Sequence, residues 1–101
     1  MALATRLARE NTQAVIKYWY PAYGHPDGPS DIAWFRVVDG WGYRTKHSPA
    51  GPSESPSFRM VADLAYPVLA MPGSPPTFQV IGSFAYTDRG APWFRIEVRP
   101  G

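Results

Sequence analysis

The chain of 101 residues has no cysteine, few aliphatic side chains and little excess charge of either sign. Without cysteine, disulfide bonds, thiolate metal ligands and cysteine nucleophiles are excluded. Leu, Ile, Val and Phe together number only 20, close to the level of ~20% below which chains are typically disordered. Disorder also requires high net charge, and here 10 basic residues nearly balance 8 acidic ones. The sequence has no run of Lys and Arg of the kind that predicts a nucleic-acid arm or a polybasic membrane segment.

Aromatic residues provide the apolar area that aliphatic residues do not. The chain has four Trp, six Tyr and five Phe, and each buried ring removes about 150–250 Å² from water. Twelve prolines and nine glycines concentrate in loops near residues 21–31, 47–57 and 72–76. The length fits a single domain. We therefore expect one folded, turn-rich domain with an aromatic core.

The N-terminal segment predicts a short amphipathic arm. Leu3 and Leu7 lie four positions apart, which is the spacing of one helical face. No apolar stretch near the start is long enough for a signal peptide, and no later stretch could span a membrane. We expect an arm or short helix over residues 1–12 and a single β domain over residues 13–101. The expected location is the cytoplasm, or the interior of a particle or complex.

Two segments near the start of the β domain show strand patterns. Residues 13–20 alternate between apolar and polar positions, although a helix continued from the arm is the competing interpretation. Asp39-Gly40 lies between two apolar runs, and this dipeptide is typical of a type I′ hairpin turn because Gly accepts a positive φ. The register of such a hairpin pairs Val38 with Trp41, Arg36 with Tyr43, and Phe35 with Arg44.

The second half of the chain predicts further strands. Residues 58–66 alternate as one strand, and residues 77–98 fit a hairpin around a three-residue loop at 88–90, with Phe84 opposite Phe94. In all, five or six strands predict an all-β domain, either a small antiparallel β-sandwich or a partly open barrel, with a short N-terminal helix.

Two short segments share the pattern Trp-Phe-Arg-aliphatic, at residues 34–37 and 93–96. Their wide separation and dissimilar surroundings favour coincidence over an internal repeat.

Residues for catalysis are scarce. The two histidines, His25 and His47, both lie in loops rich in Pro and Gly, and the sequence has no nucleophile elbow, phosphate-binding loop or zinc-protease motif. We predict that the protein is not an enzyme and uses neither a metal nor a cofactor.

Large aromatic side chains exceed what a small core needs, and this surplus indicates a binding surface. If Phe35 and Val37 point inward, the opposite face of the first hairpin is an exposed aromatic platform; the reverse assignment of the two faces stays open. In the last hairpin, Trp93 and Arg95 point away from the predicted core face. The candidate partner-binding residues are Trp93, Arg95, Trp34, Arg36, Trp41, Tyr43, Leu3 and Leu7.

These observations favour a non-catalytic structural or assembly subunit that binds partner protein chains. Small β-rich domains with N-terminal arms serve in virion and phage particles and as accessory subunits of larger complexes. The alternative is a small β-barrel that binds single-stranded nucleic acid or carbohydrate on an aromatic platform. The small basic excess disfavours nucleic acid.

Overall fold

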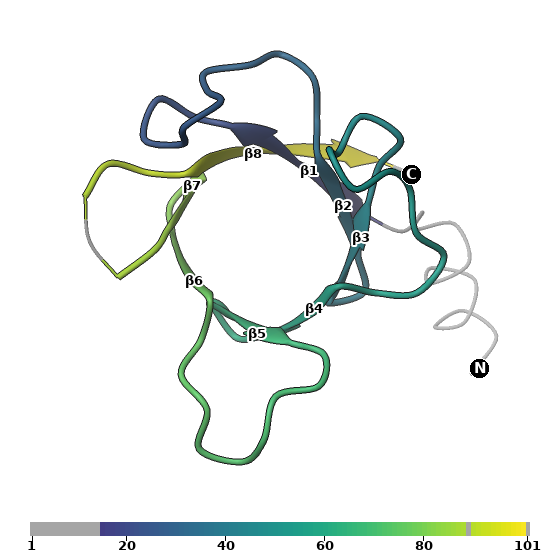
Figure 1. Cartoon of the computed structure of the whole chain (residues 1–101), viewed down its shortest axis with the longest axis vertical. Coiled ribbons are helices and arrows are strands. Elements are labelled where there is room, and N and C mark those ends of the chain that lie inside the picture. Colours follow the sequence, from purple (N-terminus) through teal and green to yellow (C-terminus); the bar gives the residue numbers. More distant parts are fainter. Residues whose placement is uncertain (1–14, 89, 101) are drawn as a thin grey trace, which may run out of the picture.

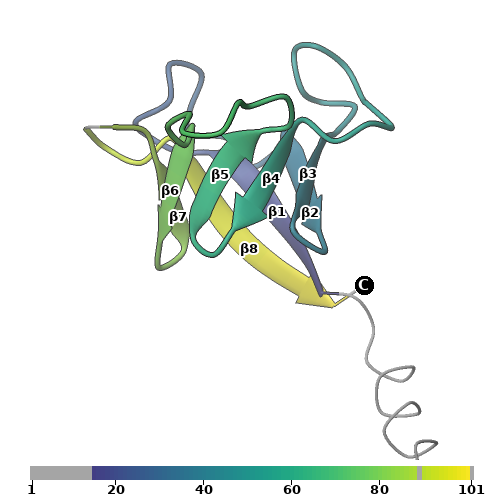
Figure 2. The same ribbon diagram turned by 90° about the horizontal axis from the view of Figure 1, so that it is seen from below.

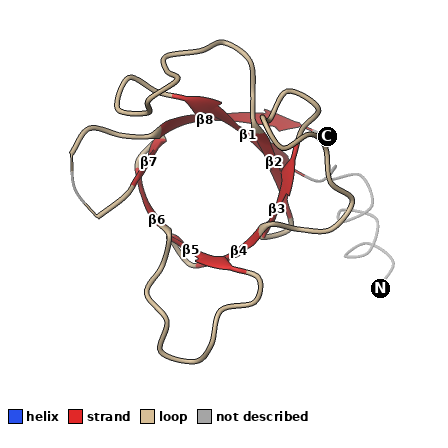
Figure 3. Ribbon diagram, in the orientation of Figure 1, coloured by secondary structure: helices blue, strands red, loops and turns tan. Residues whose placement is uncertain are grey.

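The computed structural model of the chain describes residues 15–88 and 90–100. In this part of the chain there is no helix, and eight antiparallel strands form a closed barrel in which each strand pairs with its neighbours in sequence and β8 pairs with β1 (Figure 1, Figure 3). The strands are β1 (Val15–Pro21), β2 (Phe35–Val38), β3 (Trp41–Arg44), β4 (Phe58–Val61), β5 (Leu64–Pro67), β6 (Phe78–Ile81), β7 (Phe84–Tyr86) and β8 (Phe94–Pro100).

The all-β prediction is confirmed, whereas the five- or six-stranded sandwich or partly open barrel is wrong. Closure by the β1–β8 pair leaves no open sheet edge in this barrel. Residues 15–21 form a strand, so the competing helix is wrong for that segment. The expected helix over residues 1–12, with Leu3 and Leu7, lies outside the described residues.

The first hairpin has the predicted register. Val38 pairs with Trp41 across a two-residue turn, and both turn residues have positive φ, 53° at Asp39 and 82° at Gly40. These values are those of a type I′ turn, whose twist matches the twist of the flanking strands.

Two further tight turns were not predicted. The expected single strand over residues 58–66 is a hairpin, with its turn at Ala62-Asp63 and Val61 paired with Leu64. A two-residue turn reverses the inward and outward alternation, so Leu64 faces outward although it continues the pattern of Phe58.

The predicted hairpin over residues 77–98 is also wrong in register. A turn at Gly82-Ser83 divides its first half into β6 and β7, so that Ala85 pairs with Phe94 and Phe84 pairs with Arg95. A shift of one residue moves the whole side-chain set of a strand to the other face. Phe84 therefore lies outside the barrel and Ala85 inside.

Four strand pairs, β2–β3, β4–β5, β6–β7 and β8–β1, share one pattern. Each first strand begins with a Phe and continues with Arg or Gln, which lies opposite a Tyr on the second strand. The four cross-strand pairs are Arg36 with Tyr43, Arg59 with Tyr66, Gln79 with Tyr86, and Arg95 with Tyr20. The segments 34–37 and 93–96, which the sequence suggested were similar by coincidence, occupy equivalent places in this arrangement.

The core consists of one indole surrounded by four phenyl rings. Trp19 points inward from β1, is 1% exposed, and its ring centroid lies 4.9–6.5 Å from the four Phe rings. These rings belong to the Phe residues that begin the four strand pairs: Phe35, Phe58, Phe78 and Phe94. Where β1 carries Trp19, the second strands of the other pairs carry Gly42, Ala65 and Ala85. Three small residues thus leave room for one large one.

The two ends of the barrel differ. All three two-residue turns lie at one end, the turn end, and the long connections lie at the other, the loop end (Figure 2). β1 and β8 are longer than the other strands and extend at the turn end (Figure 2).

Candidate functional site

The loop end is covered by an aromatic cluster of His25, Trp34 and Trp93. The His25 ring lies between the two indoles, with its centroid 4.6 Å from each, and 5.3 Å from Phe94 of the core. Backbone hydrogen bonds fix both tryptophans, because the Trp34 amide donates to the Trp19 carbonyl and the Trp93 amide to the Ala85 carbonyl, each at 2.9 Å.

His25 is buried in this cluster, and its environment favours the neutral ring. The Asp27 amide donates to Nδ1 of His25 at 2.9 Å. Burial lowers the pKa of His25 from its ordinary value of 6.5, and the charge of Asp27 opposes the shift. A neutral imidazole between two indoles is a structural element of the loop end, since its accessible surface is small and Nδ1 is already bonded.

The outer face of β1, β2, β3 and β8 has guanidinium groups lying over tyrosine rings. Arg95 lies 4.4 Å from the ring centroid of Tyr20, and Arg99 lies 5.6 Å from that of Tyr18. In the first hairpin, Arg36 lies 5.3 Å from the ring centroid of Tyr43.

Glu97 adds ion pairs to this face. It pairs with Arg95 and, at 3.4 Å, with Arg99. Arg99 also donates to the Tyr20 hydroxyl at 3.2 Å. The arginines near β1 and β8 are thus bound to their own chain.

A second outer region is apolar and exposed. We call Trp41, Val61, Val68, Leu69 and Met71 the apolar outer face. Leu69 is 92% and Met71 73% exposed on the connection between β5 and β6, which projects from the barrel (Figure 1). Val61 and Met71 line one hollow of this surface, and Arg59 also lines it. Trp41 lies next to the hollow, because it is the cross-strand neighbour of Arg59.

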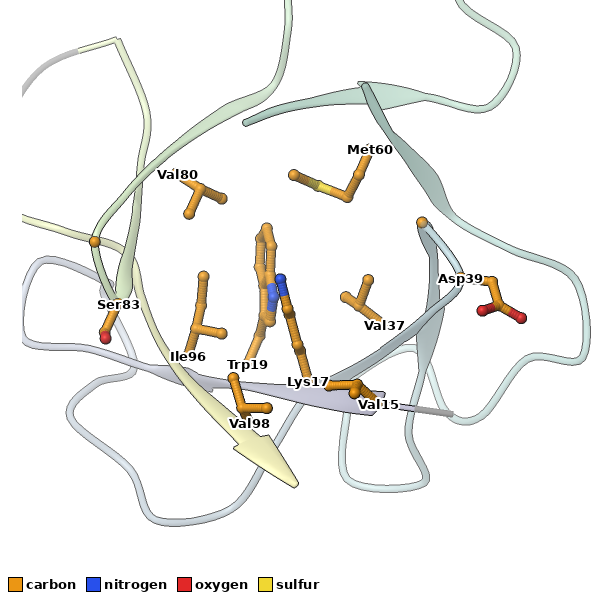
Figure 4. Close-up of a pocket in the computed structure, with 12 residues that line it drawn as sticks. Val15, Lys17, Trp19, Val37, Asp39, Met60, Val80, Ser83, Ile96 and Val98 are labelled. Atoms are coloured by element: carbon orange, nitrogen blue, oxygen red, sulfur yellow. The ribbon is translucent and has the colours of Figure 1, made fainter. Parts of the chain in front are cut away.

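A pocket of about 210 Å³ opens at the turn end, and we call it the mouth pocket. Its floor and walls are mostly apolar, and Lys17 and Trp19 project into it from β1 (Figure 4). The outer rim is exposed, whereas the floor at Trp19 is buried. The apolar lining consists of Val15, Trp19, Val37, Met60, Val80, Ile96 and Val98.

The structure separates the predicted partner-binding residues into different places. Arg36, Trp41 and Tyr43 lie on the outside of the first hairpin, because Phe35 and Val37 point inward. Of the two assignments left open by the sequence, the outward one is therefore correct for these three residues.

Trp34 and Trp93 lie elsewhere. The sequence predicted an exposed Trp93 and left the face of Trp34 open, and both are half-buried in the cluster at the loop end. The residue that covers them, His25, comes from a loop whose path the sequence did not predict. Arg95 is on the outer face as expected, and it is already paired with Tyr20 and Glu97.

Sequence reasoning missed both Lys17 and the apolar connection after β5. The sequence alone held no signal for Lys17, because a lysine between Val15 and Trp19 is unusual only once this side of β1 is known to face inward. Leu69 and Met71 stood in a loop-like context, where an apolar residue predicts neither core nor surface.

Within residues 15–88 and 90–100, no group of three or more His, Asp or Glu side chains could hold a metal ion. In the same part of the chain, no helix has the length and hydropathy needed to cross a membrane. Comparison with protein-family models, with curated proteins and with solved structures finds no match to this chain.

Proposed function

We propose that this protein is a non-catalytic structural or assembly subunit that binds a partner protein chain through its apolar outer face. The observation that carries the proposal is the exposure of Leu69 and Met71 on a projecting connection. Exposed apolar side chains that gather in one region are typical of surfaces that another molecule covers.

The neighbouring residues have the composition of a protein interface. Trp41 is 37% exposed, and beside it Arg36 and Tyr43 line a hollow on the outside of the first hairpin. Trp, Tyr and Arg are the residue types that contribute most to binding energy at such interfaces. The proposed interface therefore has an apolar part at Leu69 and Met71 on the β5–β6 connection and an aromatic part on the first hairpin.

Nucleic acid and carbohydrate are less well supported as ligands. Bases bind to exposed ring faces, but Tyr20 is buried under Arg95 and Arg36 lies over Tyr43. Trp34 and Trp93, two tryptophans on which a base could stack, are packed against His25. Of the four tryptophans, this leaves Trp41 as the exposed ring, and one ring is a poor platform.

The test is site-directed photocrosslinking in the cell that makes the protein. A photoreactive phenylalanine analogue replaces Leu69 in one variant, Trp41 in a second and Lys46 in a third. Lys46 is an exposed loop residue outside the apolar outer face and serves as the control.

We expect the same protein, either another chain or a second copy of this one, to be crosslinked from positions 69 and 41 and not from 46. Substitution of Met71 by Ser should reduce that yield at both positions. Equal yields from all three positions, or none from 69 and 41, would refute the proposal.

A further inference from the structure

We propose that the mouth pocket binds a small hydrophobic monocarboxylate, an aromatic or short-chain aliphatic acid, with its carboxylate at Lys17 and Trp19. This inference is independent of the proposed protein partner, since the pocket lies inside the barrel at the turn end and the apolar outer face lies outside it.

Lys17 is exposed at the mouth and provides a positive charge beside mostly apolar side chains. On β1 it occupies an inward position, and its partners on the neighbouring strands are Val37 and Val98. Among the described residues no carboxylate forms an ion pair with its ammonium group. An anion in the pocket would provide the partner that the protein does not.

Trp19 provides a second, unsatisfied donor. Its indole Nε1 is buried and has no hydrogen-bond acceptor in the described part of the chain. A buried donor without an acceptor costs about 1–3 kcal/mol, so most buried donors are satisfied. Nε1 is fully covered in the ligand-free protein, so a ligand oxygen reaches it only when the side chains over it shift. A carboxylate has enough lone pairs to accept from Nε1 and to pair with Lys17.

The volume fits a small ligand. An apolar protein cavity of about 150 Å³ accommodates benzene, and the mouth pocket has about 210 Å³. The difference leaves room for a carboxylate and one or two methylene groups beside a ring. The aliphatic walls at Met60, Val80 and Ile96 would cover the apolar part of the ligand.

The remaining charge at the pocket does not oppose an anion. Asp39 is on the rim, and its carboxylate is directed away from the lumen (Figure 4). Ser83, on the opposite rim, is neutral and polar. Lys17 is therefore the charged side chain that points into the pocket, and it selects for a negative ligand.

The test uses phenylacetate as the probe and phenylacetamide as its neutral counterpart. The protein is labelled with ¹³C at the methionine methyl groups, because Met60 lines the pocket and Met71 lies outside it on the β5–β6 connection. We expect phenylacetate to shift the Met60 methyl signal and to leave Met71 unchanged. Its affinity should exceed that of the amide by at least about tenfold, the expected effect of one charge-assisted hydrogen bond.

Two variants assign the effect to Lys17. Lys17→Met keeps an unbranched apolar stem and removes the charge. It should lower the affinity for phenylacetate about tenfold, to that of the amide. The matched control is Lys46→Met on an exposed loop, which should bind like the unchanged protein. If Lys17→Met does not fold, the ratio of acid to amide affinity in the unchanged protein alone tests whether the pocket selects a negative ligand.

Three results would overturn the proposal. The first is no shift at Met60 with phenylacetate at concentrations up to about 10 mM, a range that detects even millimolar affinity. The second is equal affinity for acid and amide. The third is a folded Lys17→Met variant that binds phenylacetate as tightly as the unchanged protein does.

Discussion

The loop end and the turn end of this barrel are built from the same eight strands, yet one is filled and the other is open. At the loop end, four Phe rings surround Trp19, and His25 covers them between two indoles. At the turn end, the inward side chains are aliphatic groups, one methionine and one lysine. Aromatic rings thus fill one end of the barrel interior, and the side chains at the other end leave a pocket.

The comparison also separates stability from binding. Residues that fill the loop end are buried and in contact with several rings, so their removal leaves cavities. Residues on the outer rim of the mouth pocket, such as Val15 and Val98, border solvent, so their removal should cost little stability and act mainly on ligand binding.

The largest effect is expected from Trp19→Ala. Loss of the central indole removes its contacts with all four Phe rings and should lower the free energy of unfolding by about 3–5 kcal/mol, measured by urea denaturation. The control is Val98→Ala at the exposed rim of the mouth pocket, for which we expect a change within about 0.5 kcal/mol. Similar losses from both substitutions would mean that the two ends of the barrel contribute equally to the free energy of unfolding.

Gly42→Ala should be the next most damaging. A Cβ at this position would lie 2.2 Å from Cζ of Phe58, so the ring must move within a packed core, at a cost of about 1–3 kcal/mol. Val61→Ile also adds a methyl-sized group, but on the outside of the barrel, and should change stability by less than about 0.5 kcal/mol. If Gly42→Ala is as stable as Val61→Ile, the packing described for the loop end is incorrect.

Ala62→Gly should stabilise the turn end. Ala62 has a φ of 55°, a left-handed conformation that disfavours side chains and suits glycine. We expect a gain of about 0.5–1 kcal/mol in the free energy of unfolding, since relief of strain exceeds the added entropy of the unfolded chain. Ala70→Gly, outside the set of positive φ values, should give no gain, and a gain there equal to that at position 62 would contradict the explanation.

The smallest expected effect is a dependence on pH. Because burial lowers the pKa of His25 below 6.5 in the folded protein, the unfolded chain binds the proton more readily. The free energy of unfolding therefore keeps its full value above pH 6.5. It decreases as the pH falls from 6.5 through the lowered pKa of His25.

Thermal unfolding midpoints between pH 7.5 and 5 provide the measurement. In His25→Gln the unfolding midpoint should decrease less towards low pH. In His47→Gln, at an exposed loop residue, it should decrease as in the unchanged protein. An unchanged slope in His25→Gln would exclude His25 as the cause.

Part of this fold could be predicted from sequence because one of its turns has a dipeptide that is typical of a known turn type. Asp39-Gly40 specifies a type I′ turn, and the hairpin register follows from it. Ala62-Asp63 does not predict a turn, because alanine rarely adopts a positive φ. In addition, apolar and polar residues continue to alternate across these two positions. The two missed turns, the second at Gly82-Ser83, raise six predicted strands to eight, and the lower count of five also left out the strand β1.

The candidate sites were harder to predict than the strands. The hairpin register placed Trp41 and Tyr43 on one face but left open whether that face pointed outward. The burial of Trp93 depends on a loop that brings His25 over the barrel end. Lys17 is exceptional only once its strand is known to line a closed lumen. Contacts of this kind join residues far apart in sequence, so local patterns do not contain them.

The claim that the interior is filled at one end and open at the other has a direct test in xenon binding. Xenon occupies empty apolar cavities in proteins and shifts the NMR signals of nearby groups. The account predicts shifts at the methyl groups of Met60, Val80 and Val98 around the mouth pocket, with the ring signals of Phe58 and Phe94 unaffected. Shifts at those rings, or none at the three methyl groups, would contradict it.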